Sequence, residues 1–232
     1  RKSQGRGRVA DMIIDERIAD YICSLDPGNG EFLDRVETEA RREDVPIIRK
    51  ETSAFLKMLV AAKRPERILE VGTAVGYSAL LMCRVMPENC RITTIEKFPP
   101  RIAAAKANFR EAGEEERISL LEGDAGEILK GLTGPYDFIF MDAAKGQYIH
   151  YMPEAVRLLA DGGILMSDNV LQDGDIIESR FAVERRNRTI HSRMRDYLYE
   201  LKHSDVLETS IIPLGDGVAL SIKKKKEEKE NR

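Results

Sequence analysis

The sequence predicts an α/β protein built on a doubly wound, seven-stranded, mostly parallel sheet with extra helices at its N-terminus. Short apolar runs alternate with helical patterns through much of the chain, which is typical of parallel strands joined by crossover helices. The last two apolar runs instead flank the sequence LGDG at 214–217, where the Asp-Gly pair indicates a tight hairpin turn. An antiparallel hairpin therefore completes the predicted sheet.

Helices are expected over residues 10–62. Apolar residues recur every three or four positions from Met12 to Leu25, and the sequence DPGNG ends that pattern. Two further helices are expected over residues 32–42 and from the segment VPI at 45–47 to Ala62.

The core of alternating strands and helices is expected over residues 66–222, within a single domain spanning 1–232. The charged ends, 1–8 and 223–232, are expected to be frayed. Strands are predicted at 67–71, 91–95, 118–121, 136–141, 163–167, 207–213 and 218–222. Core helices are predicted at about 76–85, 101–112, 148–159 and 178–203.

The composition limits the classes of partner. Lys and Arg number 37 against 40 Asp and Glu, so the formal net charge is −3 and a globally basic nucleic-acid-binding protein is not indicated. No stretch approaches a membrane span, and the first residues lack the apolar segment of a secretion signal, so no membrane partner is expected. Three cysteines without metal-binding spacing are typical of a reduced, cytoplasmic protein without a zinc site.

Polar residues follow two of the predicted strands. Asp142 follows the fourth strand, and Asp168 and Asn169 follow the fifth. Because parallel strands deliver their carboxyl ends to one rim of a sheet, these side chains are expected to lie together, with Lys145 beside them. Carboxylate and amide oxygens suit Mg²⁺, or the similar Mn²⁺, which keeps water ligands that a substrate can displace. The pattern favours a metal-dependent enzyme.

A glycine turn follows the first strand. Gly72 and Gly76 are expected to let the backbone approach a ligand closely, and Glu96 at the second strand end is placed to accept hydrogen bonds from ribose hydroxyls. A dinucleotide site normally requires G-x-G-x-x-G, whereas the spacing here is G-x-x-x-G, preceded by Glu70. That acid would repel a pyrophosphate but could face an ammonium group. With Asp124 at the third strand end, the pattern favours S-adenosylmethionine, which carries an amino-acid end and no phosphate.

In this order the motifs resemble the cation-dependent O-methyltransferases, the family that includes catechol and caffeoyl-CoA O-methyltransferases. The resemblance extends from Val45 to Ile222 and rests on ILEVGTAVGYSA, TTIEK, GDA, FIFMDAAKGQY and SDNV. The segments VPI, MDAAKGQY, SDNVLQDG and IIPLGDGVALS look most like the bacterial tRNA 5-hydroxyuridine methyltransferases of this family. The resemblance implies the class I methyltransferase fold, S-adenosylmethionine as the methyl donor, a divalent cation and a homodimer.

The resemblance also implies roles for individual residues. Asp142, Asp168 and Asn169 would be the metal ligands, and Lys145 would be the general base. Asp142 would also lie near the methionine end of the cofactor and belong to the catalytic centre. The rest of the cofactor pocket would be formed by Val45, Ile47, Glu70, Gly72, Gly76, Tyr77, Ser78, Glu96, Asp124 and Ala125.

Methyl transfer from a cationic sulfur requires a good nucleophile. A divalent cation lowers the pKa of a bound hydroxyl and fixes its direction, and Lys145 would then take the proton. Acceptors of the family present two oxygens on neighbouring carbons. A catechol does so with two hydroxyls, and 5-hydroxyuridine does so with its hydroxyl and the adjacent C4 carbonyl, so the residues around the catalytic core must select between them.

Two features bear on that selection. Animal catechol enzymes of this family carry a tryptophan immediately before the lysine, whereas this chain has Ala144 there and no tryptophan. An open site suits a large acceptor, and we expect methylation of 5-hydroxyuridine at the tRNA wobble position to 5-methoxyuridine, with a catechol-type or caffeoyl-CoA-like acceptor as the alternative. Arginines on the predicted helix 178–203 are expected to contact tRNA phosphates: Arg185, Arg186, Arg188, Arg193 and Arg195.

Simpler interpretations of the same residues stay open. Asp142 and Asp168 could cap helices, and Lys145 could be an ordinary exposed lysine. Tyr77 and Ser78 could merely begin a helix, and the arginines could equally face solvent or a second subunit. A cofactor-binding or RNA-binding protein without catalysis is the remaining class, and the presence of both metal segments with the lysine disfavours it.

Overall fold

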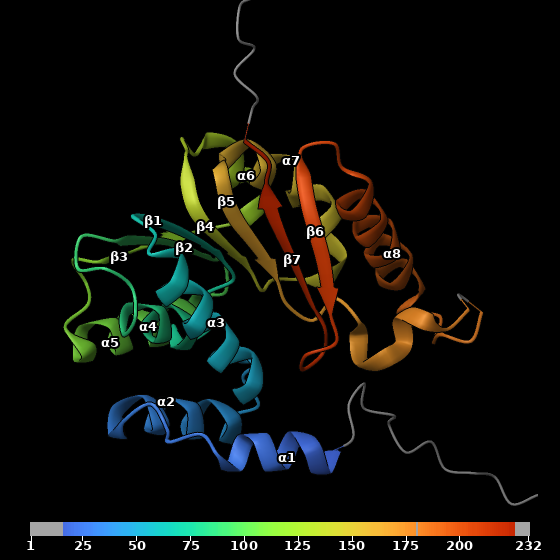
Figure 1. Ribbon diagram of the computed structural model, residues 1–232. Helices are drawn as coiled ribbons and strands as arrows, with labels where there is room; N and C mark the ends of the chain where they lie inside the picture. Colours follow the sequence, from blue (N-terminus) through green and yellow to red (C-terminus); the bar gives the residue numbers. More distant parts are fainter. Residues whose placement is uncertain (1–15, 180, 226–232) are drawn as a thin grey trace, which may run out of the picture.

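The structure is a computed structural model that describes residues 16–179 and 181–225. Within these ranges the chain forms one seven-stranded sheet in the order β3-β2-β1-β4-β5-β7-β6 (Figure 1). The first five strands pair in parallel, and β7 pairs antiparallel with both β5 and β6. The predicted sheet with its closing hairpin is thereby confirmed. The strands are β1 (Arg67–Val71), β2 (Arg91–Glu96), β3 (Ile118–Glu122), β4 (Tyr136–Met141), β5 (Leu159–Ser167), β6 (Leu207–Ile212) and β7 (Val218–Lys223).

The strand bounds follow the apolar runs closely because these strands are covered on both faces. β1 and β4 begin and end where the sequence predicts, whereas β5 begins at Leu159 instead of residue 163. The added residues include Gly162 at a φ of 70°, and the pairing with β4 shifts its register there. The early part of β5 therefore lacks the apolar run by which a buried strand is recognised.

The helices surround this sheet. The predicted helix from Met12 is described only as α1, because its first residues lie outside the described ranges, as do residues 1–8 and 226–232 of the predicted tails. A short helix, α6, had no counterpart in the prediction. The α-helices are α1 (Glu16–Ser24), α2 (Glu31–Arg42), α3 (Lys50–Lys63), α4 (Tyr77–Cys83), α5 (Pro99–Ala112), α6 (Ala125–Gly131), α7 (Tyr148–Leu158) and α8 (Arg188–His203). The 3₁₀ turns are η1 (Lys145–Gln147) and η2 (Gln172–Ile177).

The last long helix is shorter than predicted, since α8 begins at Arg188 and not at residue 178. The Arg188 guanidinium donates to the carbonyls of Val183 and Phe181, both at 3.2 Å. Side-chain donors thus satisfy carbonyls that a continuous helix would pair with its own N–H groups. Arg185 and Arg186 consequently lie in the turn before the helix and not on it.

Alternating side chains along the strands feed two separate cores. Phe138 and Phe140 of β4 point to the face covered by α2, α3, α4 and α5, whereas Ile139 and Met141 point to the face covered by α6, α7 and α8. The sheet is therefore the middle of three layers, as the doubly wound architecture requires.

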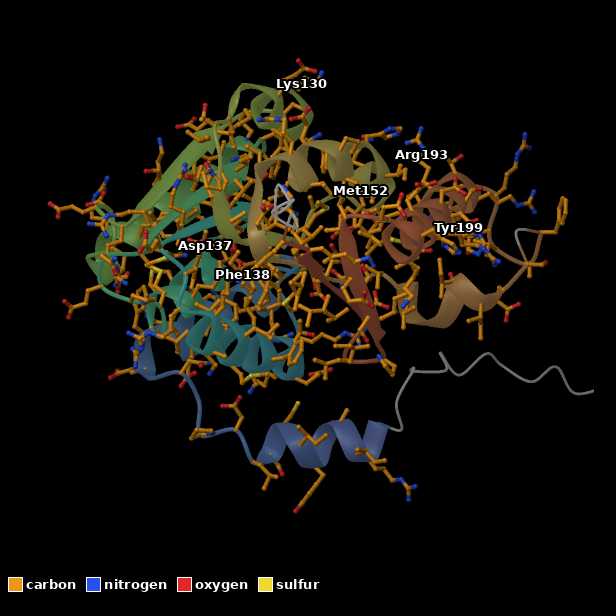
Figure 2. All side chains as sticks on the ribbon, turned by 45° about the horizontal axis from the view of Figure 1, so that its top comes forward. Lys130, Asp137, Phe138, Met152, Arg193 and Tyr199 are labelled. Carbon is orange, nitrogen blue, oxygen red and sulfur yellow. The ribbon has the colours of Figure 1, made fainter. Side chains whose placement is uncertain are left out.

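The N-terminal helix α1 lies at the edge of the fold (Figures 1 and 2), where it contacts α3. Its apolar side chains Ile18, Tyr21 and Ile22 are exposed. Among the helices of the described residues, none has both the length and the apolarity needed to cross a membrane.

Gly76 provides a test of how α4 packs on α5. It has a φ of 84°, and a Cβ there would lie 2.4 Å from Cε1 of Phe109 on α5. We expect Gly76→Ala to lower the free energy of unfolding by about 2–4 kcal/mol, from backbone strain plus overpacking. Gly113 is the matched control because its φ is 70° and a Cβ would have no neighbour within 4 Å. Gly113→Ala should cost only about 1–2 kcal/mol; equal losses in urea unfolding would contradict the packing argument.

Candidate active site

Three neighbouring strands end at the same level, which places the predicted metal and cofactor segments beside one another. Val71 of β1 pairs with Met141 of β4, and Met141 pairs with Ser167 of β5. The ladder continues one residue beyond the strands: Asp142 donates its N–H to Val71 O at 2.9 Å, and Asp168 donates to Met141 O at 3.0 Å. Asp142 and Asp168 therefore leave adjacent strand ends in register.

Gly72 brings the glycine turn directly against the first metal segment. Its φ is 102°, and a Cβ at this position would lie 2.0 Å from the carbonyl oxygen of Asp142. Only glycine allows both the backbone conformation and this approach. Whereas the sequence suggested that Gly72 makes room for a ligand, the structure shows that it also makes room for Asp142.

Glu96 is held rigidly at the end of β2. One carboxylate oxygen accepts from the N–H of Ala74 at 2.9 Å, and the other accepts from Lys97 at 2.9 Å and Phe98 at 3.0 Å. A carboxylate has about four lone-pair sites, so Glu96 keeps acceptor capacity toward the pocket that it lines. This geometry is compatible with the predicted bonds to ribose hydroxyls.

A cavity of about 330 Å³ lies at the carboxyl ends of the strands. The segment Pro46-Ile47-Ile48 covers one side of it, and Lys145 and Asn169 lie on the side of the metal segments. Seven residues predicted to contact the cofactor line this cavity: Ile47, Gly72, Tyr77, Ser78, Glu96, Ala125 and Asp142. The remaining ones, Val45, Glu70, Gly76 and Asp124, do not line it.

Glu70 lies beneath the cavity and not in it. It is fully buried, and its carboxyl group accepts from the hydroxyls of Ser78 at 2.6 Å and Thr94 at 2.5 Å. Burial raises the pKa of Glu70 to about 7, against these two hydrogen bonds, which lower it. The structure thus places the acid under the turn, where it fixes β2 and α4, and not opposite an ammonium group.

The other residues outside the cavity also have structural contacts. Asp124 caps α6 by accepting from the N–H of Gly126 at 2.9 Å, and Val45 packs against the core on the face of the sheet covered by α2 to α5. Tyr77 does line the cavity, but its hydroxyl donates to the carboxylate of Glu37 on α2 at 3.1 Å. The phenol therefore links the N-terminal helices to the cavity wall, leaving its ring to face a ligand.

Two of the predicted metal ligands, Asp142 and Asp168, are carboxyl groups whose ionised forms are disfavoured by burial and by neighbouring acids. Burial raises the pKa of the Asp142 carboxyl, and the neighbouring Glu70 raises it further. Burial likewise raises the pKa of Asp168, with Asp142 and Asp216 adding to it. Asp168 is 1 % exposed, so water screens little of this repulsion.

A divalent cation fits this arrangement, because it would compensate the two carboxylates and accept oxygen ligands from them. Asn169 has a φ of 58° and lines the cavity next to them, adding an amide oxygen. Within residues 16–179 and 181–225 no group of three or more His, Cys, Asp or Glu side chains is arranged for a metal. The candidate ligand set is therefore two carboxylates and one amide, with room for water or acceptor oxygens.

Two contacts in this site were not predicted. Asp216, in the turn between β6 and β7, forms an ion pair with Lys145 at 2.9 Å. The buried Tyr148 hydroxyl accepts from the N–H of Ala143 at 3.2 Å and shares its single proton between the carbonyls of Met141 and Asp168. Both residues stand in quoted motifs, but Lys145 as the partner of Asp216, and Asp168 as a partner of Tyr148, follow other strands, and no local pattern indicates these contacts.

The predicted RNA-contacting arginines do not line the cavity. Arg193, seen on α8 in Figure 2, donates to the carbonyl of Gly146 beside the lysine at 3.2 Å. Arg195 donates to the carbonyl of Ile176 in η2 at 3.3 Å. Arg188, Arg193 and Arg195 therefore hold loops near the site through hydrogen bonds to backbone carbonyls. Arg185 and Arg186 lie exposed in the turn before α8.

The sheet order, the closing hairpin and a cavity at the strand ends define a class I methyltransferase. A profile described as O-methyltransferase matches residues 29–224, and the chain belongs to that family. The predicted family is thus confirmed, and the chain is an S-adenosylmethionine-dependent O-methyltransferase by family and fold.

Individual relatives agree with this assignment. A catechol O-methyltransferase of Niastella koreensis is 38% identical over 128 residues, which cover 53% of this chain but only 58% of that enzyme. A caffeoyl-CoA O-methyltransferase of Populus kitakamiensis is 29% identical over 86% of this chain and 89% of its own. The SAH-bound crystal structure of the Podospora anserina methyltransferase PaMTH1 superposes with a TM-score of 0.82 at 27% identity, over 91% of this chain and 97% of that one.

The raised pKa values of Asp142 and Asp168 lead to a pH-dependent test of the metal site. A cation binds the ionised carboxylates, so it must displace protons that these groups retain toward neutral pH. We expect Mn²⁺ to raise the melting temperature more, and to bind more tightly by calorimetry, at pH 8 than at pH 6, with proton release. Asp168→Asn should remove most of this effect, whereas Asp137→Asn, on β4 away from the cavity, should leave it intact. Equal binding at both pH values would contradict the assignment.

Proposed function

We propose that this chain uses a divalent cation to methylate an oxygen of an acceptor that presents two neighbouring oxygens. One observation carries the proposal: Asp142 both lines the cofactor cavity and stands in register beside Asp168 of the metal segment. A methyl donor in the cavity and an acceptor chelated by the cation would therefore both lie next to Asp142. Bringing two reactants together in this way contributes on the order of 7–11 kcal/mol to lowering a barrier.

The residues of the chain would divide the work. Asp142, Asp168 and Asn169 would hold the cation, preferably Mg²⁺ with Mn²⁺ as a substitute. When bound, the cation would lower the pKa of the acceptor hydroxyl and fix the orientation of that hydroxyl. Lys145 Nζ, on the cavity wall, would take the hydroxyl proton, and Glu96 would hold the ribose of the donor.

For the acceptor itself we propose 5-hydroxyuridine at the tRNA wobble position. The chain has no tryptophan, and Ala144 on the cavity wall leaves space that an aromatic side chain would fill. Beyond the second metal segment, Phe181 is 84% exposed and lies near Arg188, with Arg185 and Arg186 following in the chain. Exposed aromatic and arginine side chains together suit a single-stranded RNA loop, through stacking and phosphate contacts.

A second candidate is a catechol-type or caffeoyl-CoA acceptor. It is favoured by the relatives named catechol and caffeoyl-CoA O-methyltransferase, and it needs the same pair of oxygens. The two candidates share every catalytic residue and differ only in what lies outside the metal segments.

An acceptor panel tests the proposal. The enzyme with Mg²⁺ and methyl-labelled S-adenosylmethionine would be given an anticodon stem-loop containing 5-hydroxyuridine, the same loop with uridine, catechol, and caffeoyl-CoA. We expect label in the 5-hydroxyuridine loop and none in the uridine loop, which lacks the hydroxyl. Asp142→Asn should abolish labelling of every acceptor. Turnover of caffeoyl-CoA or catechol with an unlabelled stem-loop would replace the RNA acceptor with the second candidate.

Neutralising the exposed arginines tests the RNA surface separately. We expect Arg185→Gln with Arg186→Gln to weaken stem-loop binding and to reduce the slope of affinity against salt by roughly one or two phosphate contacts. Turnover of any small acceptor should stay unchanged, because neither side chain lines the cavity. Arg42→Gln with Arg110→Gln is the control, as both side chains are 72% exposed on other helices. If both double variants weakened binding equally, Arg185 and Arg186 would be ordinary surface residues with no specific role in RNA binding.

A further inference from the structure

The turn between β6 and β7 reaches into the proposed catalytic centre. Asp216 in this turn is 3% exposed, and its carboxylate is 2.9 Å from Nζ of Lys145. The two residues are 71 positions apart in the chain, Lys145 in η1 after β4 and Asp216 in the turn after β6. A buried carboxylate at this position is costly unless it has a definite partner, and Lys145 is one of its partners.

Backbone hydrogen bonds fasten this turn to the second metal segment. Leu171 donates its N–H to Asp216 O, and Val170 donates to Gly217 O, both at 3.0 Å. Gly217 has a φ of 83°, and a Cβ there would lie 2.3 Å from Cγ of Leu171. The turn therefore presses on the residues that directly follow Asp168 and Asn169, so its position is fixed relative to the metal ligands.

Lys145 needs such a fixed partner. Its four-carbon stem is flexible, and its side chain is 35% exposed at the cavity wall. The positive charge of Lys145 lowers the pKa of both Asp142 and Asp168. Within the described residues, however, Lys145 Nζ donates its hydrogen bond to Asp216 and not to either of these two carboxyl groups. The amine is thereby kept off the two carboxylates that would hold the cation.

We propose that Asp216 is a positioning residue that holds the amine of Lys145 at the acceptor side of the cavity. This rests on the proposed base role of the lysine. Nζ acts as a base in its neutral form, after its ammonium proton has been released to solvent. When the acceptor O–H bond breaks, its proton forms a new N–H bond at Nζ, and the ammonium group so formed is again paired with the Asp216 carboxylate. The arrangement follows the general pattern in which a third group orients the catalytic base.

A double-mutant cycle tests this role, with the 5-hydroxyuridine stem-loop and caffeoyl-CoA as acceptors. Asp216→Asn should lower kcat on the order of 10²-fold through misplacement of the amine, while SAH binding by calorimetry stays unchanged. Asp216→Glu, which keeps the charge, should recover part of kcat. Glu208→Gln is the matched control, since it neutralises an exposed acid on the same hairpin and should leave kcat intact.

Lys145→Met should lower kcat by roughly 10²–10⁴-fold, and adding Asp216→Asn to it should cause no further loss, because the acid acts through the lysine. Equal losses from Asp216→Asn in both backgrounds would overturn the inference and assign Asp216 to turn packing alone. Full kcat in Lys145→Met would instead refute the base role, and the inference with it. A loss in Lys145→Met combined with wild-type kcat in Asp216→Asn would overturn the inference while keeping the proposed base.

Discussion

The contact between Gly72 and the backbone of Asp142 is the constraint on which the site depends. A Cβ at Gly72 would lie 2.0 Å from Asp142 O, so the cofactor turn and the first metal segment can approach only through a glycine. The parallel ladder sets that approach, because Val71, Met141 and Ser167 lie in register across three strands. The cavity and the segments with the proposed metal ligands are consequently two sides of one strand edge, so a methyl donor and a cation bound there would lie next to each other.

Several acidic side chains lie at the same strand edge, and the fold stabilises some of them with hydrogen bonds more fully than others. Glu70 and Glu96 are each satisfied by hydrogen bonds from hydroxyl or backbone donors, and they serve the turn and the strand ends. Asp142 and Asp168 keep raised pKa values despite the nearby charge of Lys145. Natural proteins leave such conflicts mainly at functional sites, and here the conflict lies where a divalent cation would relieve it.

The elements that carry a local signal could be predicted from the sequence. The buried runs of β1 and β4 are continuous and apolar, so both strands could be bounded from the sequence. The sequence did not predict α6 because it is only seven residues long. The predicted α8 began too early because the Arg188 guanidinium satisfies backbone carbonyls of the loop that precedes the helix. The adjacent placement of Asp142 and Asp168 at the strand ends followed from the rule for parallel sheets, but the burial of Glu70 beneath the turn and the pairing of Asp216 with Lys145 did not. Those contacts depend on the alignment of distant strands, which periodicity does not encode.

The most direct measurement of the central claim is anomalous diffraction from crystals grown with Mn²⁺ and SAH. We expect one manganese peak within about 2.0–2.3 Å of oxygens from Asp142, Asp168 and Asn169, with SAH in the adjoining cavity and its sulfur directed toward the metal side. Manganese bound elsewhere, with these three side chains ligating nothing, would contradict the claim that one strand edge joins metal and methyl donor.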